Sequence, residues 1–189
     1  MHPELQAVID ELEAASARLR DLQARASDEQ WTRRPGPHRW SIGECIAHLN
    51  LTSAAYVPLL RSALDEARYS GYRAPRRYRL DPIGWLLWKG ISYPGKMKSK
   101  TSAPFVPSGE QPKGQTSAEF ERLQAQILAL AREADGLPLH RVKIASPFDS
   151  RVRYNLFSAL AIFARHQHRH LWQAERNITA HCPPPTAHC

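Results

Sequence analysis

The sequence predicts an all-α protein: a four-helix bundle with a long basic excursion, rich in proline and glycine, between its second and third helices. Four long segments repeat apolar residues at steps of three and four, strand patterns are nearly absent, and six of the fifteen prolines fall in one stretch. With 189 residues, 42% of them hydrophobic, the chain can bury a sizeable core. We expect one helical domain at residues 1–178, with an irregular basic insertion or lid at 68–115, and a flexible tail at 179–189.

The first helix is expected from about Pro3 to Arg25. Its apolar residues fall on one stripe: Leu5, Val8, Leu12, Ala15, Leu19 and Leu22. Acidic residues occupy its early turns and arginines its late ones, as the helix dipole favours. The run Pro35-Gly36-Pro37 then predicts a connector without regular structure.

The second helix opens with a recognisable start signal. Ser41 and Glu44 have the spacing of a capping box, in which each side chain satisfies a backbone amide of the other residue. The apolar pattern continues to about Arg68. Pro58 lies inside this helix and removes one backbone donor, so we expect a kink or a break near residues 54–57.

Residues 68–115 hold six of the fifteen prolines and six of the nine glycines. One short helix is expected here, starting at Asp81-Pro82 and carrying Trp85 and Trp88. Because a structureless loop of this length is unusual in a compact domain, we favour a packed excursion or lid over a mobile basic linker. The two tryptophans would then pack onto the bundle, with stacking on nucleic-acid bases as the alternative.

The remaining elements complete the bundle. Thr116 and Glu119 suggest a second capping box and a third helix, which residues 136–138 (Gly-Leu-Pro) would end. Residues 139–153 fit either a short hairpin or an extended loop. The fourth helix is expected at about Tyr154–Asn177.

The chain is basic, with a formal net charge of +8, and the charge is uneven. Between Arg68 and Lys100 there are nine lysines or arginines and a single acid, Asp81. Such a segment could meet phosphates, an anionic membrane or a small acidic ligand, although a solvated basic loop is the simpler interpretation.

Other features indicate a cytoplasmic protein. The amino terminus becomes acidic at once and lacks the basic and apolar regions of a secretory signal. The longest charge-free apolar run, Tyr154–Ala164, is too short to cross a bilayer, so we expect no membrane partner. Three cysteines, two of them in the last eight residues, do not form a disulfide framework.

The fourth helix carries three closely spaced histidines. His166 and His170 are four residues apart and therefore share one face, whereas His168 is rotated by about 200° and points elsewhere. The shared face is mostly apolar before the histidines, which places the pair inside the bundle. Each buried ring must satisfy two nitrogens, and a metal ion would satisfy one of them. This spacing alone only suggests a metal site.

His48 adds a third candidate ligand from the second helix, on a face that also carries Cys45 and several apolar residues. A lone core histidine is more often hydrogen-bonded than metal-bound. Packing of the two helices could nevertheless bring His48 against His166 and His170, and three imidazoles would leave positions open for water or substrate. Cys45 could approach as a fourth ligand, although an ordinary core thiol is the simpler interpretation.

Two motifs carry a resemblance to a known family. The first is W-S-x-x-E-x-x-x-H-L, formed by Trp40, Ser41, Glu44, His48 and Leu49. The second is R-H-x-x-R-H-x-x-Q, formed by Arg165, His166, Arg169, His170 and Gln173. Together they resemble the DinB superfamily of metal-dependent four-helix-bundle proteins. The resemblance implies up-down-down-up wiring, a metal held by three histidines near one end of the bundle, and often a homodimer. The long basic excursion departs from the family pattern and leaves the substrate and partner open.

The functional expectation follows from the residues and the resemblance together. We expect a metal-dependent enzyme, a hydrolase or a thiol-dependent S-transferase, whose metal ligands are His48, His166 and His170. Zinc is the expected ion, with nickel, iron or manganese as alternatives, and a low-molecular-weight thiol could be the cofactor. The substrate would be a small molecule, which could be anionic. No catalytic base is identified, because Glu44 is accounted for as a helix cap.

Two alternatives from other classes remain. The chain could be a non-catalytic metal-binding module of a stress response. It could also bind nucleic acid through the basic segment 68–100, a partner that we rank below a small molecule.

Overall fold

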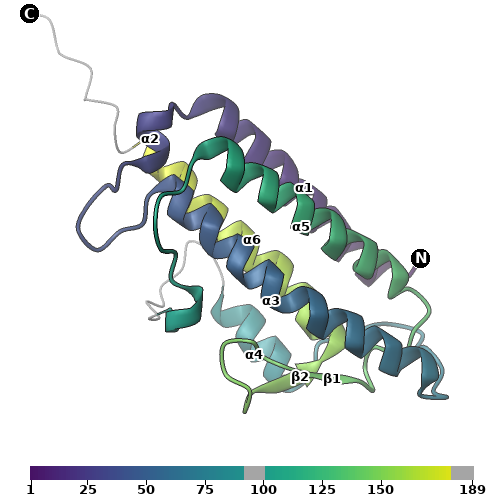
Figure 1. Ribbon diagram of the computed structural model, residues 1–189. Coiled ribbons are helices and arrows are strands. Elements are labelled where there is room, and N and C mark those ends of the chain that lie inside the picture. Colours follow the sequence, from purple (N-terminus) through teal and green to yellow (C-terminus); the bar gives the residue numbers. More distant parts are fainter. Residues whose placement is uncertain (92–100, 180–189) are drawn as a thin grey trace, which may run out of the picture.

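The structure, a computed structural model, describes residues 1–91 and 101–179 (Figure 1). Within these residues the chain forms six α-helices, one 3₁₀ turn and one two-stranded hairpin. The elements are α1 (Pro3–Arg25), α2 (Asp28–Thr32), α3 (Ile42–Tyr69), α4 (Pro82–Gly90), η1 (Ala103–Phe105), α5 (Lys113–Glu133), β1 (Lys143–Ala145), β2 (Arg153–Asn155) and α6 (Leu156–Thr179). The predicted all-α bundle is confirmed, and the long helices are α1, α3, α5 and α6.

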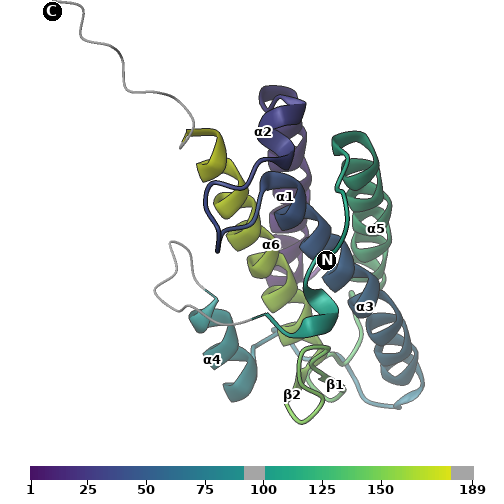
Figure 2. The same ribbon diagram turned by 60° about the vertical axis from the view of Figure 1, so that its left-hand side comes forward.

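The four long helices are wired up-down-down-up, as expected. The helices α1 and α6 run parallel, because Arg18 pairs with Glu175 near the carboxyl ends of both. The helices α3 and α5 also run parallel, since the Asn50 amide donates to the Thr116 carbonyl near the start of both. Figures 1 and 2 show the first pair lying antiparallel to the second. The start of α3 therefore faces the last turns of α6.

Helix α3 begins as its sequence predicts and ends one residue beyond the expected Arg68. Ser41 accepts from the Glu44 amide, and the Glu44 carboxylate accepts from the Ser41 amide. Of the kink or break expected near residues 54–57, the break is wrong, because the helix runs through Pro58. Pro58 and Ala54 are both exposed, so the carbonyl that loses its donor can accept from water instead.

The start of α5 differs from the prediction. The helix begins at Lys113 rather than Thr116, and its cap residue Pro112 offers no side-chain acceptor. The expected capping box is absent because the Thr116 hydroxyl donates to the Pro112 carbonyl and Glu119 pairs with Arg122. Pro112 ends the extended segment before the helix, and this backbone feature outweighs the side-chain signal.

A capping box that the sequence analysis overlooked starts the short helix α2. Ser27 and Gln30 exchange two hydrogen bonds there. The helix places Trp31 in the core, where its side chain is fully buried. Gly43 of α3 lies against this indole, and a Cβ atom at Gly43 would collide with it.

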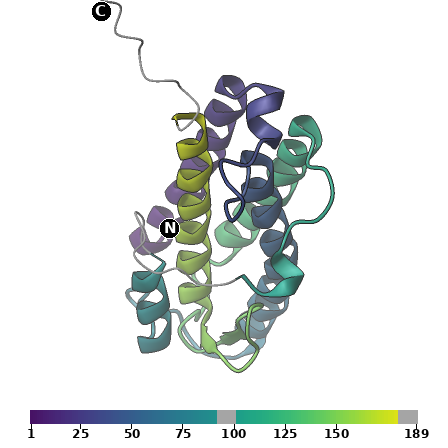
Figure 3. The same ribbon diagram turned by 90° about the vertical axis from the view of Figure 1, so that its left-hand side faces the viewer.

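The excursion between α3 and α5 is packed against the bundle in its described part. Helix α4 starts at the predicted Asp81-Pro82 cap and lies beside α6 (Figure 3). The turn η1 contacts α3. Of the two alternatives for residues 139–153, the hairpin is found, and it extends to Asn155: Ile144 of β1 pairs with Tyr154 of β2. Helix α6 therefore begins at Leu156 rather than at Tyr154.

The core consists of two clusters along the bundle axis. One, toward the hairpin, includes a hydrogen bond between the hydroxyls of Tyr56 and Tyr154, which are 2.7 Å apart. The other surrounds Trp31 and includes Leu49 and Leu171, which directly follow His48 and His170 in the sequence. The division of the chain into residues 1–178 and a tail stays a prediction, and the histidine–cysteine pairs of the tail lie outside the described residues.

Within residues 1–91 and 101–179, no helix has both the length and the apolar character needed to cross a bilayer.

Candidate metal centre

The three predicted ligand residues meet at one point between α3 and α6. His48 lies on the second turn of α3, and His166 and His170 lie on successive turns of α6. The Nε2 atom of His166 is 3.3 Å from Nε2 of His48 and 3.1 Å from Nε2 of His170. One ring nitrogen from each residue lies within 4.8 Å of the others, and this group could hold a metal ion.

These distances agree with the geometry of a metal site. Nitrogens bound to zinc lie about 2.0–2.1 Å from the ion, which places two of them about 2.9 Å apart at a right angle and about 3.4 Å apart at the tetrahedral angle. Both separations from His166 Nε2 fall inside this interval. The donor set of three imidazoles suits zinc, copper, iron or nickel.

The orientation of His48 is set by the excursion. Its Nδ1 atom is 2.7 Å from the Phe105 carbonyl oxygen of η1. A carbonyl only accepts hydrogen bonds, so Nδ1 carries the proton and Nε2 presents its lone pair to the cluster. A hydrogen bond from the outer ring nitrogen to a carbonyl is the arrangement that fixes metal-binding histidines in other proteins.

Burial keeps all three rings neutral. Burial lowers the pKa of His48, although the Phe105 carbonyl partly opposes this shift. Burial, followed by the proximity of His48 and Arg169, lowers the pKa of His166 to about 3. The pKa of His170 is also lowered well below its usual value, chiefly by burial and then by the two neighbouring imidazoles. Neutral imidazoles are the form that binds metal ions.

Without an ion, the cluster satisfies its inner nitrogens poorly. His48 Nε2 has no proton, so it can accept but not donate. One proton on His166 Nε2 would have to be shared between His48 and His170. A cation at the centre would use the lone pairs of all three nitrogens, so the residues present fit a bound metal ion.

Aromatic side chains surround the histidines. The Trp40 ring lies 4.9 Å from His48, and the Phe148 ring lies 5.7 Å from His166. Phe105 packs on Phe148 at 4.5 Å. Among the three histidines only His166 is partly exposed, so the approach to the cluster is on its side. Apolar walls of this kind strengthen electrostatic interactions with a bound cation.

His168 takes no part in the cluster, as the helical spacing predicts. Its Nε2 atom is 2.9 Å from the Glu11 carbonyl, and its Nδ1 atom is 2.7 Å from an Arg18 guanidinium nitrogen. The side chain is buried against α1 and has partners at both nitrogens.

The other candidate residues have structural roles. Cys45 is a buried free thiol that does not belong to the ligand group, and burial raises its pKa to about 12. Glu44 caps α3 and also accepts from Arg34, with 2.8 Å between Nε and Oε2. Although burial opposes it, the hydrogen bond from Arg34 contributes most to lowering the pKa of Glu44. Neither residue is placed to act as a base or fourth ligand.

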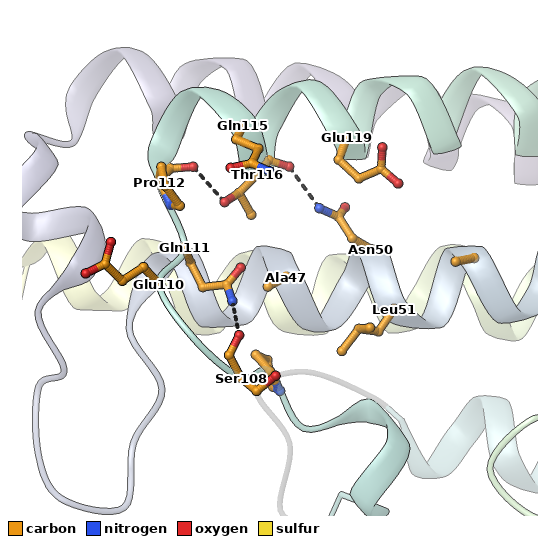
Figure 4. Close-up of a pocket in the computed structure, with 12 residues that line it drawn as sticks. Ala47, Asn50, Leu51, Ser108, Glu110, Gln111, Pro112, Gln115, Thr116 and Glu119 are labelled. Atoms are coloured by element: carbon orange, nitrogen blue, oxygen red, sulfur yellow. Dashed lines mark hydrogen bonds between the residues drawn. The ribbon is translucent and has the colours of Figure 1, made fainter.

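A groove of about 300 Å³ lies beside α3 and the start of α5 (Figure 4). Its walls are formed by α3 residues such as Ala47 and Leu51, by residues 107–108 and 110–112, and by the first turns of α5. Asn50 crosses it to bond the Thr116 carbonyl at 2.9 Å. None of the three histidines lines this groove, so it is separate from the metal centre.

A comparison with protein-family models agrees with the geometry. The model of the DinB superfamily matches residues 11–174, which include all three histidines. The chain belongs to the DinB superfamily. No curated protein and no solved structure matched the chain. The helical bundle and the cluster of His48, His166 and His170 are thus features of a member of the DinB superfamily.

The sequence analysis missed the contributions of Phe105 and Phe148. Phe105 is 57 residues from His48, and it contributes through its backbone carbonyl, which no side-chain motif marks. A signal of moderate value was available: Phe105 is an aromatic residue that, with Val106, lies between prolines 104 and 107.

Proposed function

We propose that this DinB protein is a metal-dependent enzyme that activates a thiol or a water molecule for attack on a small electrophile. The convergence of the Nε2 atoms of His48, His166 and His170 is the observation that supports this proposal. When bound, a divalent ion with three neutral ligands keeps its full charge and lowers the pKa of a coordinated water or thiol. Zinc is the ion that we propose first.

The surrounding residues contribute by orientation and by exclusion of water. Phe105 holds the His48 ring in the tautomer with a free inner lone pair. Trp40 and Phe148 cover the cluster on two sides. The partly exposed edge of His166 is the approach that we propose for substrate and thiol.

A positive charge near the cluster favours an anionic substrate or thiol. Arg169 lies close enough to His166 and His170 to lower the pKa of both rings. The same positive charge attracts anions toward the site. An acidic thiol with a carboxylate would meet this requirement.

In the S-transferase form of the proposal, the thiol sulfur forms a bond to an electrophilic carbon. The bond from that carbon to its leaving group breaks, and the thiol proton goes to the leaving group or to solvent. In the hydrolase form, water replaces the thiol and the balance is otherwise the same. No side chain of the chain is assigned as a base.

Metal analysis tests the first step. Elemental analysis of protein prepared without a histidine tag should give about one divalent ion per chain, and substitution of all three histidines by alanine should remove it. Circular dichroism of both proteins shows whether the fold is retained. A wild-type protein that binds no divalent ion under any loading condition would refute the proposal.

Turnover tests the second step. Metal-loaded protein should react low-molecular-weight thiols, or water, with at least one member of a panel of activated esters, epoxides and alkyl halides. His170→Ala should abolish that turnover, while His168→Ala on the same helix should retain it. Stoichiometric metal with no turnover across the panel would instead indicate a non-catalytic metal-binding module.

The predicted partners remain predictions. A homodimer can be tested by light scattering. Nucleic-acid binding through residues 68–100 would appear as a salt-dependent shift of DNA that is lost when Arg73, Arg76, Arg77 and Arg79 are replaced.

A further inference from the structure

The outer face of α4 is apolar, which is unusual for a helix on the surface of a bundle. Ile83 is 45% exposed, Trp85 50% and Leu86 65%. Together with Lys89 and Gly90, these residues form one continuous arc around the nine-residue helix. A surface helix normally presents polar residues to solvent, so an apolar outer arc marks a contact surface. The expectation that Trp85 packs onto the bundle is therefore wrong, whereas Trp88 is half-buried over Arg165.

The helix is held firmly in place, with this arc facing outward. On its inner side Gly84 contacts Ser158 of α6 so closely that any Cβ atom there would collide. The Asp81 carboxylate accepts from the Gly84 amide at 2.8 Å and from the Asn155 amide at 3.0 Å. The outer arc is thus a stable part of the folded surface rather than a loosely attached segment.

Basic residues lie at both ends of the apolar arc. At the carboxyl end the Lys89 ammonium lies 4.9 Å from the Trp85 ring. At the amino end the Lys143 ammonium lies 3.8 Å from the Asp81 carboxylate, and Arg79, two residues before Asp81, is exposed. The helix itself contains no acidic residue. A tryptophan and a leucine between basic side chains match the pattern of segments that lie in the interface of an anionic bilayer.

We propose that α4 docks this protein on the surface of an anionic lipid bilayer. Ile83, Trp85 and Leu86 enter the boundary between headgroups and acyl chains, and Lys89 and Arg79 contact the lipid phosphates. This is a peripheral contact, whereas the sequence analysis predicted no membrane partner. The net charge of +8 favours the approach to an anionic surface.

A second copy of the chain is a less suitable occupant. A stable protein interface buries about 800 Å² on each partner, far more than three partly exposed apolar side chains can supply. Two copies joined through this face would also bring Lys89 and Arg79 against the same cations of the partner, and an anionic lipid surface avoids that repulsion.

Vesicle flotation of the full chain tests the proposal. Wild-type protein should float with vesicles of phosphatidylcholine and phosphatidylglycerol, should not float with phosphatidylcholine alone, and should bind less as salt rises. Trp85→Ser and Leu86→Ser should each weaken vesicle binding at least about tenfold, because each removes an apolar side chain that the bilayer would bury. The matched control is Tyr69→Ser. Tyr69 is the last residue of α3 and is 88% exposed, and Figure 1 shows the end of α3 away from α4, so its loss should leave binding unchanged.

Three results would overturn the proposal. The first is a wild-type protein that stays unbound to anionic vesicles at low salt. The second is salt-sensitive binding that survives both α4 substitutions, which would assign the contact to charge alone. The third is a dimer, seen by light scattering, that the α4 substitutions dissociate while the wild-type protein ignores vesicles. None of these readouts depends on the metal or on turnover.

Discussion

Helix α6 carries two kinds of buried histidine, only two residues apart. His168 faces α1, where its Nε2–H donates to the Glu11 carbonyl and its Nδ1 accepts from Arg18. His166 faces α3, where its Nε2 atom meets two other imidazole nitrogens instead of a protein acceptor. Both rings have a lowered pKa, and burial is the main cause in each case.

The two sites differ in whether protein groups alone satisfy the ring nitrogens. The protein alone satisfies both nitrogens of His168, so this histidine needs no ligand. The cluster around His166 gathers three lone pairs and leaves a cation as the group that would satisfy them. Burial and a shifted pKa therefore do not distinguish a structural histidine from a metal ligand, whereas the hydrogen-bond partners do.

Removal of His166 should have the largest effect. His166→Ala takes away the nitrogen that lies within 3.3 Å of both other ligands, and two imidazoles hold a divalent ion far less tightly than three. We expect metal affinity to fall by more than about a hundredfold, measured by competition with a chromophoric chelator. His168→Ala is the control on the same helix; an equal loss of affinity in that variant would contradict the distinction.

Loss of Phe105 should weaken the site without removing a ligand. Phe105→Ala removes the ring that packs on Phe148, so the carbonyl that orients His48 is held less firmly. Metal affinity should fall by about ten- to a hundredfold, the range typical of outer partners of metal-binding histidines. The neighbouring exposed Val106 provides the control Val106→Ala, which should retain wild-type affinity. If Phe105→Ala and Val106→Ala bind the metal ion with equal affinity, η1 does not hold His48 in place.

Substitution of His168 should reduce stability and leave the metal in place. His168→Ala leaves the Glu11 carbonyl and the Arg18 guanidinium without their shared partner on α6. The expected cost is about 1–3 kcal/mol in the free energy of unfolding, measured by urea titration of the metal-free protein. Elemental analysis should still give the wild-type metal content. A loss of metal with unchanged stability would reverse the roles of the two histidines.

Much of this arrangement is readable from the sequence. The spacing of His166, His168 and His170 separates the two faces of α6, because four residues return a helix to the same side and two do not. The Ser41–Glu44 capping box sets the phase of α3 and so turns His48 inward. Local signals of this kind depend only on helix geometry.

The parts that sequence reasoning missed depend on long-range packing. The hydrogen bond from His48 to Phe105 uses a backbone carbonyl, which every residue type offers. The exposed side of Trp85 results from Gly84 fitting closely against Ser158, and this fixes which face of α4 turns outward. The start of α5 depends on Pro112, whereas Thr116 and Glu119 gave a misleading capping signal. Such features follow from the tertiary contacts rather than from local periodicity.

The last expected effect is a dependence of stability on pH that distinguishes the two sites. A histidine whose pKa is lowered by folding stays neutral in the native state, while the unfolded chain takes up a proton near pH 6.5. Stability is therefore complete above that pH and falls as the pH drops toward the lowered native pKa, by up to about 1.4 kcal/mol per pH unit for each such histidine. In the metal-free protein this applies to His48, His166, His168 and His170.

Urea titrations of metal-free protein between pH 7 and pH 5 measure this slope. The variant with all three cluster histidines replaced by alanine should retain only the part due to His168. Because the folded protein already keeps the cluster rings neutral, zinc should raise the stability of the wild-type protein by a similar amount across this range, and should leave the variant unchanged. A variant slope equal to that of the wild-type protein would mean that the cluster histidines titrate alike in the folded and unfolded states, and hence that their burial has no energetic consequence.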